Sequence, residues 1–148
     1  MLTVAALLLS VASPLPSPQS LPAVAVRAPR AVLDVQVART AAQRDLGLMS
    51  VRHLRAHTGM VFIFPSDDVV TFWMKNTLVP LDMVFAGSDG VVRAVFAHVP
   101  VVPLDTPDDQ IPRRGARAKY VLELPAGEAQ KDGIRTGVHI GDLPAGTP

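Results

Sequence analysis

Cysteine is absent from the 148 residues, and this absence excludes several kinds of chemistry at once. Without thiols the chain forms no disulfide, no thiolate zinc or iron–sulfur site and no cysteine nucleophile. Tryptophan and tyrosine occur once each, and 14 basic side chains nearly balance 13 acidic ones. A net charge of +1 does not provide the basic surface that binds nucleic acid, so we expect no nucleic-acid partner.

Charge is also lacking at the N-terminus, where residues 1–26 contain no acidic or basic side chain. Residues 4–12 form an apolar run about half as long as the ~20 residues that span a bilayer, so we expect no stable transmembrane helix. Several prolines follow, and residues 23–25 (AVA) have the small-x-small pattern of a signal-peptidase site. The pattern predicts a signal peptide over residues 1–25 and a periplasmic or secreted protein. The alternative is a disordered, proline-rich tail on a cytosolic protein.

The remaining residues have the composition of one folded domain, since 49% of the chain is hydrophobic and 18% is charged. We expect a linker at residues 26–30, a single β-rich domain at residues 31–143 and a tail at residues 144–148. Residues 31–38 alternate between apolar and polar side chains, which indicates a half-buried strand. Thr40 then has the position of an N-cap for a short helix over residues 41–49.

Strand patterns recur through the rest of the chain. Residues 59–64 are apolar on both faces and end at Pro65, as in a central strand, and residues 66–68 resemble a turn. A hairpin is predicted between residues 69–74 and 82–86, continuing as an antiparallel meander. The later segments are a strand at 91–97, a long loop at 100–115, a strand at 119–124, a short helix at 126–132, and a turn with a last short strand at 133–142. We therefore predict a mostly β (α+β) fold: a compact antiparallel, barrel-like or sandwich domain with one or two short helices.

Common catalytic and nucleotide-binding motifs are absent, including G-x-S-x-G, G-x-x-x-x-G-K-[ST], H-E-x-x-H and G-x-G-x-x-G. His53 and His57 have the spacing of two ligands on one helical face, but Arg52 and Arg55 would repel a cation there. We interpret the two histidines as solvated loop residues. The sequence therefore predicts no metal site and no cofactor.

The single tryptophan lies in the stretch FWMKNTLVPLD, residues 72–82. In an extended strand, Phe72 and Met74 share one face while Trp73 lies on the other with Lys75. Closure of the hairpin would bring Asp82 towards Lys75. An indole beside a cation, an amide and a carboxylate suits a small polar or cyclic ligand.

The predicted ligand site at this hairpin has a basic rim supplied by the end of the long loop. Its members are Trp73, Lys75, Asn76, Asp82 and Arg114, with Arg113 and Arg117 beside Arg114. The alternative is structural: an ion pair between Lys75 and Asp82, a turn shaped by Asn76, and Trp73 packed in the core.

Four ordered blocks also resemble one known family. They are RDLGLM at residues 44–49, GMVFIFP at 59–65, FWMKNTLVPLD at 72–82 and YVLELPAG at 120–127. Together they are similar to domain of unknown function 192, over roughly residues 33–142. The resemblance implies a small β-rich domain that is often exported, and it implies no established activity.

Three classes of function remain open. The first is an exported envelope protein that binds a small polar or cyclic ligand at the Trp73 hairpin. The second is an enzyme, a hydrolase or lyase that uses Asp82, Lys75 or Glu123. The third is a structural or interaction domain without a small-molecule ligand.

Overall fold

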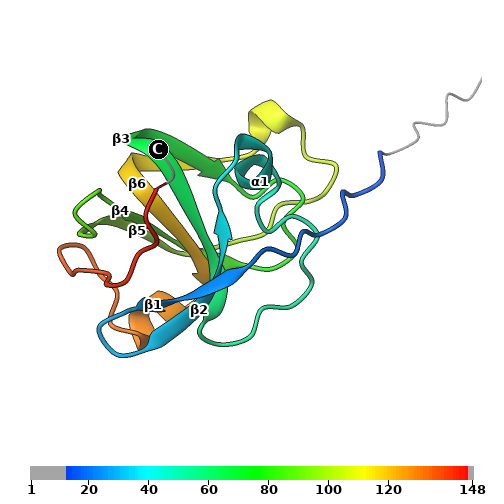
Figure 1. The fold of residues 1–148 in the computed structure, drawn as a ribbon. Helices are drawn as coiled ribbons and strands as arrows, with labels where there is room; N and C mark the ends of the chain where they lie inside the picture. The colour runs from blue at the N-terminus through cyan, green and yellow to red at the C-terminus, as the bar shows by residue number, and fades with distance from the viewer. Residues whose placement is uncertain (1–12, 147–148) are drawn as a thin grey trace, which may run out of the picture.

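Six strands form one mixed sheet in the computed structural model, which describes residues 13–146. Their order across the sheet is β1-β2-β3-β6-β4-β5, and Figure 1 shows their arrangement. The strands are β1 (Ala23–Arg27), β2 (Val32–Ala38), β3 (Thr58–Trp73), β4 (Leu81–Ala86), β5 (Val92–Val99) and β6 (Arg113–Pro125). The helices are α1 (Ala41–Leu46), the 3-10 turn η1 (Asp108–Gln110) and α2 (Glu128–Lys131).

The prediction of a mostly β domain with short helices is confirmed, and of the barrel-like and sandwich forms that were expected, the barrel does not form. The sheet does not close into a barrel, and β1 and β5 are its two edges. It is also not wholly antiparallel, because β2 and β3 pair in parallel. The segment between them contains α1, which returns the chain to the start of β3 and makes that parallel pairing feasible.

Two hydrophobic clusters cover the two faces of the sheet, and the central strands β3 and β6 contribute to both. Val61 and Leu122 belong to one cluster, while Met60 and Val121 belong to the other. This is the alternation of a strand that is buried on both faces. The prediction of a central strand over residues 59–64 is therefore confirmed.

The turn predicted at residues 66–68 is wrong, because β3 continues through Pro65 to Trp73. The β3–β6 register shifts between Ile63 and Asp68, so this stretch is irregular without ending the strand. Proline lacks an N–H for the ladder and is tolerated at such an irregularity. The predicted hairpin is wrong as well, since β6 lies between β3 and β4 and pairs with both.

The local signals around α1 predict its start correctly. The Thr40 hydroxyl accepts a hydrogen bond from the Gln43 N–H, and the Gln43 side chain accepts from the Thr40 N–H, forming a capping box. The helix ends earlier than predicted, at Leu46, and Gly47 follows with φ of 48°. This positive φ favours glycine, and a Cβ at Gly47 would also lie only 3.3 Å from the Phe62 ring.

The N-terminal boundary of the domain is earlier than predicted, so the linker at residues 26–30 is wrong. Ala23–Arg27 form β1, pair antiparallel with β2, and bury Val26. Further upstream, the Gln19 side chain donates hydrogen bonds to the carbonyls of Gln43 and Gly47, at 2.8 and 2.9 Å. The predicted apolar run at residues 4–12 lies outside the described residues. Within residues 13–146, no helix is long and apolar enough to cross a membrane.

Candidate functional site

Trp73 lies at the end of β3, directly opposite Arg113 at the start of β6. The Arg113 guanidinium is 4.2 Å from the centroid of the indole ring, and the Lys75 ammonium is 5.2 Å from it. Both distances are within the range of cation–π interaction. Trp73 is half-buried, whereas Phe72 and Met74 are in the core. The predicted alternation, with Phe72 and Met74 on the core face and Trp73 on the other, is therefore confirmed.

Lys75 was expected to lie beside Asp82. It forms an ion pair instead with Asp108, a residue of the long loop. Its Nζ lies 2.5 Å from Oδ2 of Asp108, the first residue of η1. The two side chains are 33% and 57% exposed, so solvent screens the pair. The ion pair brings this part of the loop to the side of Trp73.

Asp82 is remote from the predicted site and has a structural role. Its side chain is fully buried in β4, where one oxygen accepts from the N–H of His98 at 2.8 Å and the other from the N–H of Ala129 at 2.9 Å. Asp82 therefore joins β4 to β5 and to α2. The expectation that hairpin closure places it beside Lys75 is wrong because β3 and β4 are not neighbours.

The two other predicted residues, Asn76 and Arg114, lie in different settings. Asn76 follows β3 with φ of 53°, its carbonyl accepts from the Ser50 N–H, and its side-chain amide is 3.8 Å from the sulfur of Met49. Arg114 is opposite Phe72 in the register and donates to the carbonyl of Arg113. Asn76 thus fixes the loop after α1, while Arg114 makes no direct contact with the indole of the kind that Arg113 makes.

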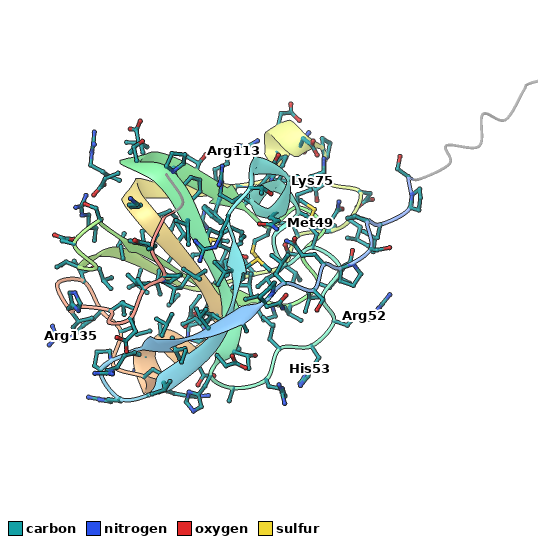
Figure 2. All side chains as sticks on the ribbon, in the orientation of Figure 1. Met49, Arg52, His53, Lys75, Arg113 and Arg135 are labelled. Carbon is teal, nitrogen blue, oxygen red and sulfur yellow. The ribbon has the colours of Figure 1, made fainter. Side chains whose placement is uncertain are left out.

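A pocket of about 30 Å³ opens between α1 and the end of β3, and we call it the Glu123 pocket. Figure 2 shows Lys75 and Met49, two of its lining residues, beside α1. The chain segment from α1 to residue 49 forms one wall, and Trp73, Lys75 and Thr77 form another. The volume is enough for one or two water molecules or for a small functional group of a ligand.

A larger groove of about 390 Å³ adjoins the Glu123 pocket. The pocket and the groove share four lining residues, and the groove adds apolar surface from Phe64. Together they form a wide outer space with a narrow end at a buried carboxyl group. The shared residues are Arg44, Asp45, Phe72 and Trp73.

Glu123 is the unusual group in this pocket. It lies between Met60 of β3 and Met83 of β4 in the sheet register, and only 5% of its surface is exposed. Within residues 13–146 its carboxyl group has no hydrogen-bond or ion-pair partner. Burial raises the pKa of Glu123 from 4.5 to about 8, because the charged form loses its hydration. At neutral pH it is therefore mostly a neutral acid that can donate one hydrogen bond and accept others.

From the sequence, Glu123 was a candidate only in the hydrolase or lyase alternative, with no connection to Trp73. The available signal was the charged residue at an inward position of the apolar strand YVLEL, residues 120–124. The pocket walls from α1 and from Thr77 were missed. Strand alternation does not reveal them, because the pocket forms where three segments distant in sequence meet.

Comparison with known proteins supports the family resemblance. A family model described as "DUF192: Uncharacterized ACR" matches residues 24–141. A solved protein of unknown function from Novosphingobium aromaticivorans is 33% identical, with a TM-score of 0.69, covering 81% of this chain and 85% of that one. A Sinorhizobium meliloti structure, described as "a putative transcription regulator", is 34% identical, with a TM-score of 0.69 and coverage of 84% and 96%. No curated protein matches the chain significantly.

Proposed function

The chain belongs to the domain of unknown function 192 family, and from that premise we propose that it is an exported domain that binds a small polar ligand in the Glu123 pocket and the adjoining groove. The observation that carries the proposal is the buried Glu123 carboxyl, which has no partner among the described residues and faces the pocket. Burying a polar group without a hydrogen bond is costly, and a ligand that pairs with it recovers that cost.

The surroundings favour a neutral or anionic ligand over a cationic one. Glu123 is mostly uncharged at pH 7, while Lys75 and Arg113 place positive charge beside Trp73. A hydroxyl, amide or carboxyl group of the ligand would reach Glu123, and the rest of the molecule would occupy the groove. A ring would stack on the indole only after displacing a cation, so the apolar wall at Phe64 is its more accessible contact.

Binding is measurable through Trp73, because it is the only tryptophan in the chain. Its emission is recorded while sugars, cyclic polar metabolites and cell-wall fragments are titrated, and the melting temperature is followed in parallel. A ligand that shifts both in the native protein and neither in Glu123→Ala supports the proposal. Asp105→Asn, which alters an exposed carboxylate, is the control that retains binding. A ligand response unchanged in Glu123→Ala would contradict the assignment of the site.

One observation favours an enzyme as the second candidate. A carboxyl group with a pKa of about 8 in a pocket is suited to general acid–base chemistry near neutral pH. Asp82 is not a candidate for this acid–base catalysis, because both of its oxygens accept backbone hydrogen bonds in the core. Turnover that is lost in Glu123→Gln while ligand binding persists would favour the enzyme over the binding domain.

Export is supported by the apolar run at residues 4–12 and the small-x-small pattern at residues 23–25. The cleavage expected after Ala25 would cut β1 between Ala25 and Val26. Expression with a start that supplies a basic n-region, followed by fractionation and N-terminal sequencing, tests the proposal. Recovery of the chain only from the cytosol, with its N-terminus intact, would overturn it.

A further inference from the structure

Three metal-ligating side chains from distant parts of the sequence meet near α2. His57 Nδ1 lies 3.2 Å from Oδ2 of Asp132 and 3.4 Å from Oε1 of Glu128. One ligand atom from each residue lies within 4.8 Å of the other two. Glu128 and Asp132 are four residues apart on α2 and its C-cap, which brings them to the same side of the helix. The cluster is separate from the Glu123 pocket, because none of its three residues lines that pocket.

The spacing of these atoms suits a metal ion. Zinc ligands lie about 2.0–2.2 Å from the ion, so neighbouring ligand atoms of a tetrahedral site are roughly 3.2–3.6 Å apart. The two distances from His57 are close to that edge length. One imidazole nitrogen and two carboxylate oxygens are also a donor set that Zn²⁺ accepts.

The charges of the cluster also favour a bound cation. The side chains of Glu128 and Asp132 are only 4% and 3% exposed. No lysine or arginine among residues 13–146 forms an ion pair with either carboxylate, and the Glu128 side chain makes no hydrogen bond there. Two buried carboxylates this close repel each other unless a proton or a cation lies between them. Among residues 13–146, the only basic side chain within ion-pair distance of either carboxylate is that of His57, which carries charge only when protonated.

We propose that His57, Glu128 and Asp132 bind a divalent transition-metal ion, with Zn²⁺ the best match to the donor set. The half-exposed His57 side leaves room for water to complete the coordination. The His57 carbonyl accepts from the Asp34 N–H at 2.8 Å, so the histidine is held against β2 before any ion binds. The ion would fasten the segment that precedes β3 to α2. Sequence spacing does not reveal this site, because His57 is more than 70 residues from Glu128 and Asp132.

The test uses the untagged full chain and Zn²⁺ alone. Calorimetric titration is expected to show one ion per chain. At a free zinc concentration about 100-fold above Kd, the melting temperature is expected to rise on the order of 10 °C. His57→Ala and Glu128→Gln are each expected to weaken binding at least about tenfold, as loss of one ligand of three requires. Co²⁺ in place of Zn²⁺ is expected to give the visible absorption of a tetrahedral site, and this readout does not depend on stability.

His53→Ala is the matched control, because His53 is exposed in the same segment and lies outside the cluster. It is expected to keep the stoichiometry and affinity of the unaltered chain. His57→Ala provides a variant at a half-exposed position in case Glu128→Gln fails to fold. Absence of zinc binding, or binding that is equal in His57→Ala and the unaltered chain, would overturn the proposal. The cluster would then be a direct contact of the His57 ring with the two carboxylates, without an ion.

Discussion

At the scale of single residues, Glu123 couples folding to pH. Its pKa is about 8 in the folded chain and about 4.5 in the unfolded chain, so the folded chain binds more protons between these values. Stability therefore falls as pH rises from about 4.5 to about 8. One pKa unit corresponds to about 1.4 kcal/mol, so the loss is on the order of 3–5 kcal/mol.

Glu123→Gln is expected to remove this dependence, because glutamine is neutral throughout and has nearly the same shape. The variant should match the unaltered chain near pH 4.5 and exceed it in free energy of unfolding above pH 8. Urea denaturation at a series of pH values measures both. Asp105→Asn, at an exposed site, is the control for general charge effects. Equal pH profiles for Glu123→Gln and the unaltered chain would mean that Glu123 is not buried as described.

Lys75 gives the second prediction at this scale. Because its ion pair with Asp108 is exposed to solvent, Lys75→Ala is expected to lower the free energy of unfolding by only about 0–1 kcal/mol. Loss of the ammonium group near the indole should nevertheless alter the Trp73 emission and its quenching by iodide. A loss of several kcal/mol would show instead that Lys75 holds the domain together.

At the scale of structural elements, Asp82 fixes the position of α2. This helix has four residues and cannot be stable alone, so its attachment to the sheet matters. Asp82→Ala leaves the N–H groups of His98 and Ala129 without acceptors, which is expected to cost roughly 2–5 kcal/mol. Asp82→Asn keeps one oxygen acceptor and should cost less. Denaturation compares the two variants, and equal stability of Asp82→Ala and the unaltered chain would refute the tether.

Elements with strong local signals were predictable from the sequence. Alternation marked β2, the Thr40 capping box marked the start of α1, and the apolar run at residues 59–64 marked the core of β3. Pairings between strands were less predictable. β3 and β4 are close in sequence but separated in space by β6, which arrives about 40 residues later and offers a longer partner. The short sequence separation of β3 and β4 led to the prediction of a hairpin. In the structure each of these strands pairs with β6 instead.

At the scale of the whole molecule, the candidate site was also only partly predictable, because long-range contacts bring its residues together. Trp73 and Lys75 are near neighbours in sequence, and their proximity was predictable. Asp82 was assigned to them through the hairpin that does not form, while Glu123 and the α1 wall come from segments that only the folded sheet brings together. The role of Gln19 was also hidden, because the proline-rich composition around it is typical of a linker.

The N-terminal segment gives the last prediction, which concerns the integrity of the whole domain. A chain that begins at Val26, as cleavage after Ala25 would produce, loses three of the five residues of β1 and the Gln19 hydrogen bonds that hold the end of α1. Because α1 forms a wall of the Glu123 pocket, this chain should be less stable and should bind any pocket ligand more weakly.

A chain that begins at Ser13 keeps both features and is the matched control, while Gln19→Ala in that chain isolates the two hydrogen bonds. Gln19→Ala is expected to cost about 1–3 kcal/mol, and the Val26 start should cost more because the edge strand is also lost. Thermal and urea denaturation rank the three chains. If the Val26 start were as stable as the Ser13 start, β1 would contribute nothing to the domain, and cleavage after Ala25 would be compatible with the intact fold. If the expected ranking holds, any export cleavage that leaves the domain intact must occur upstream of Gln19.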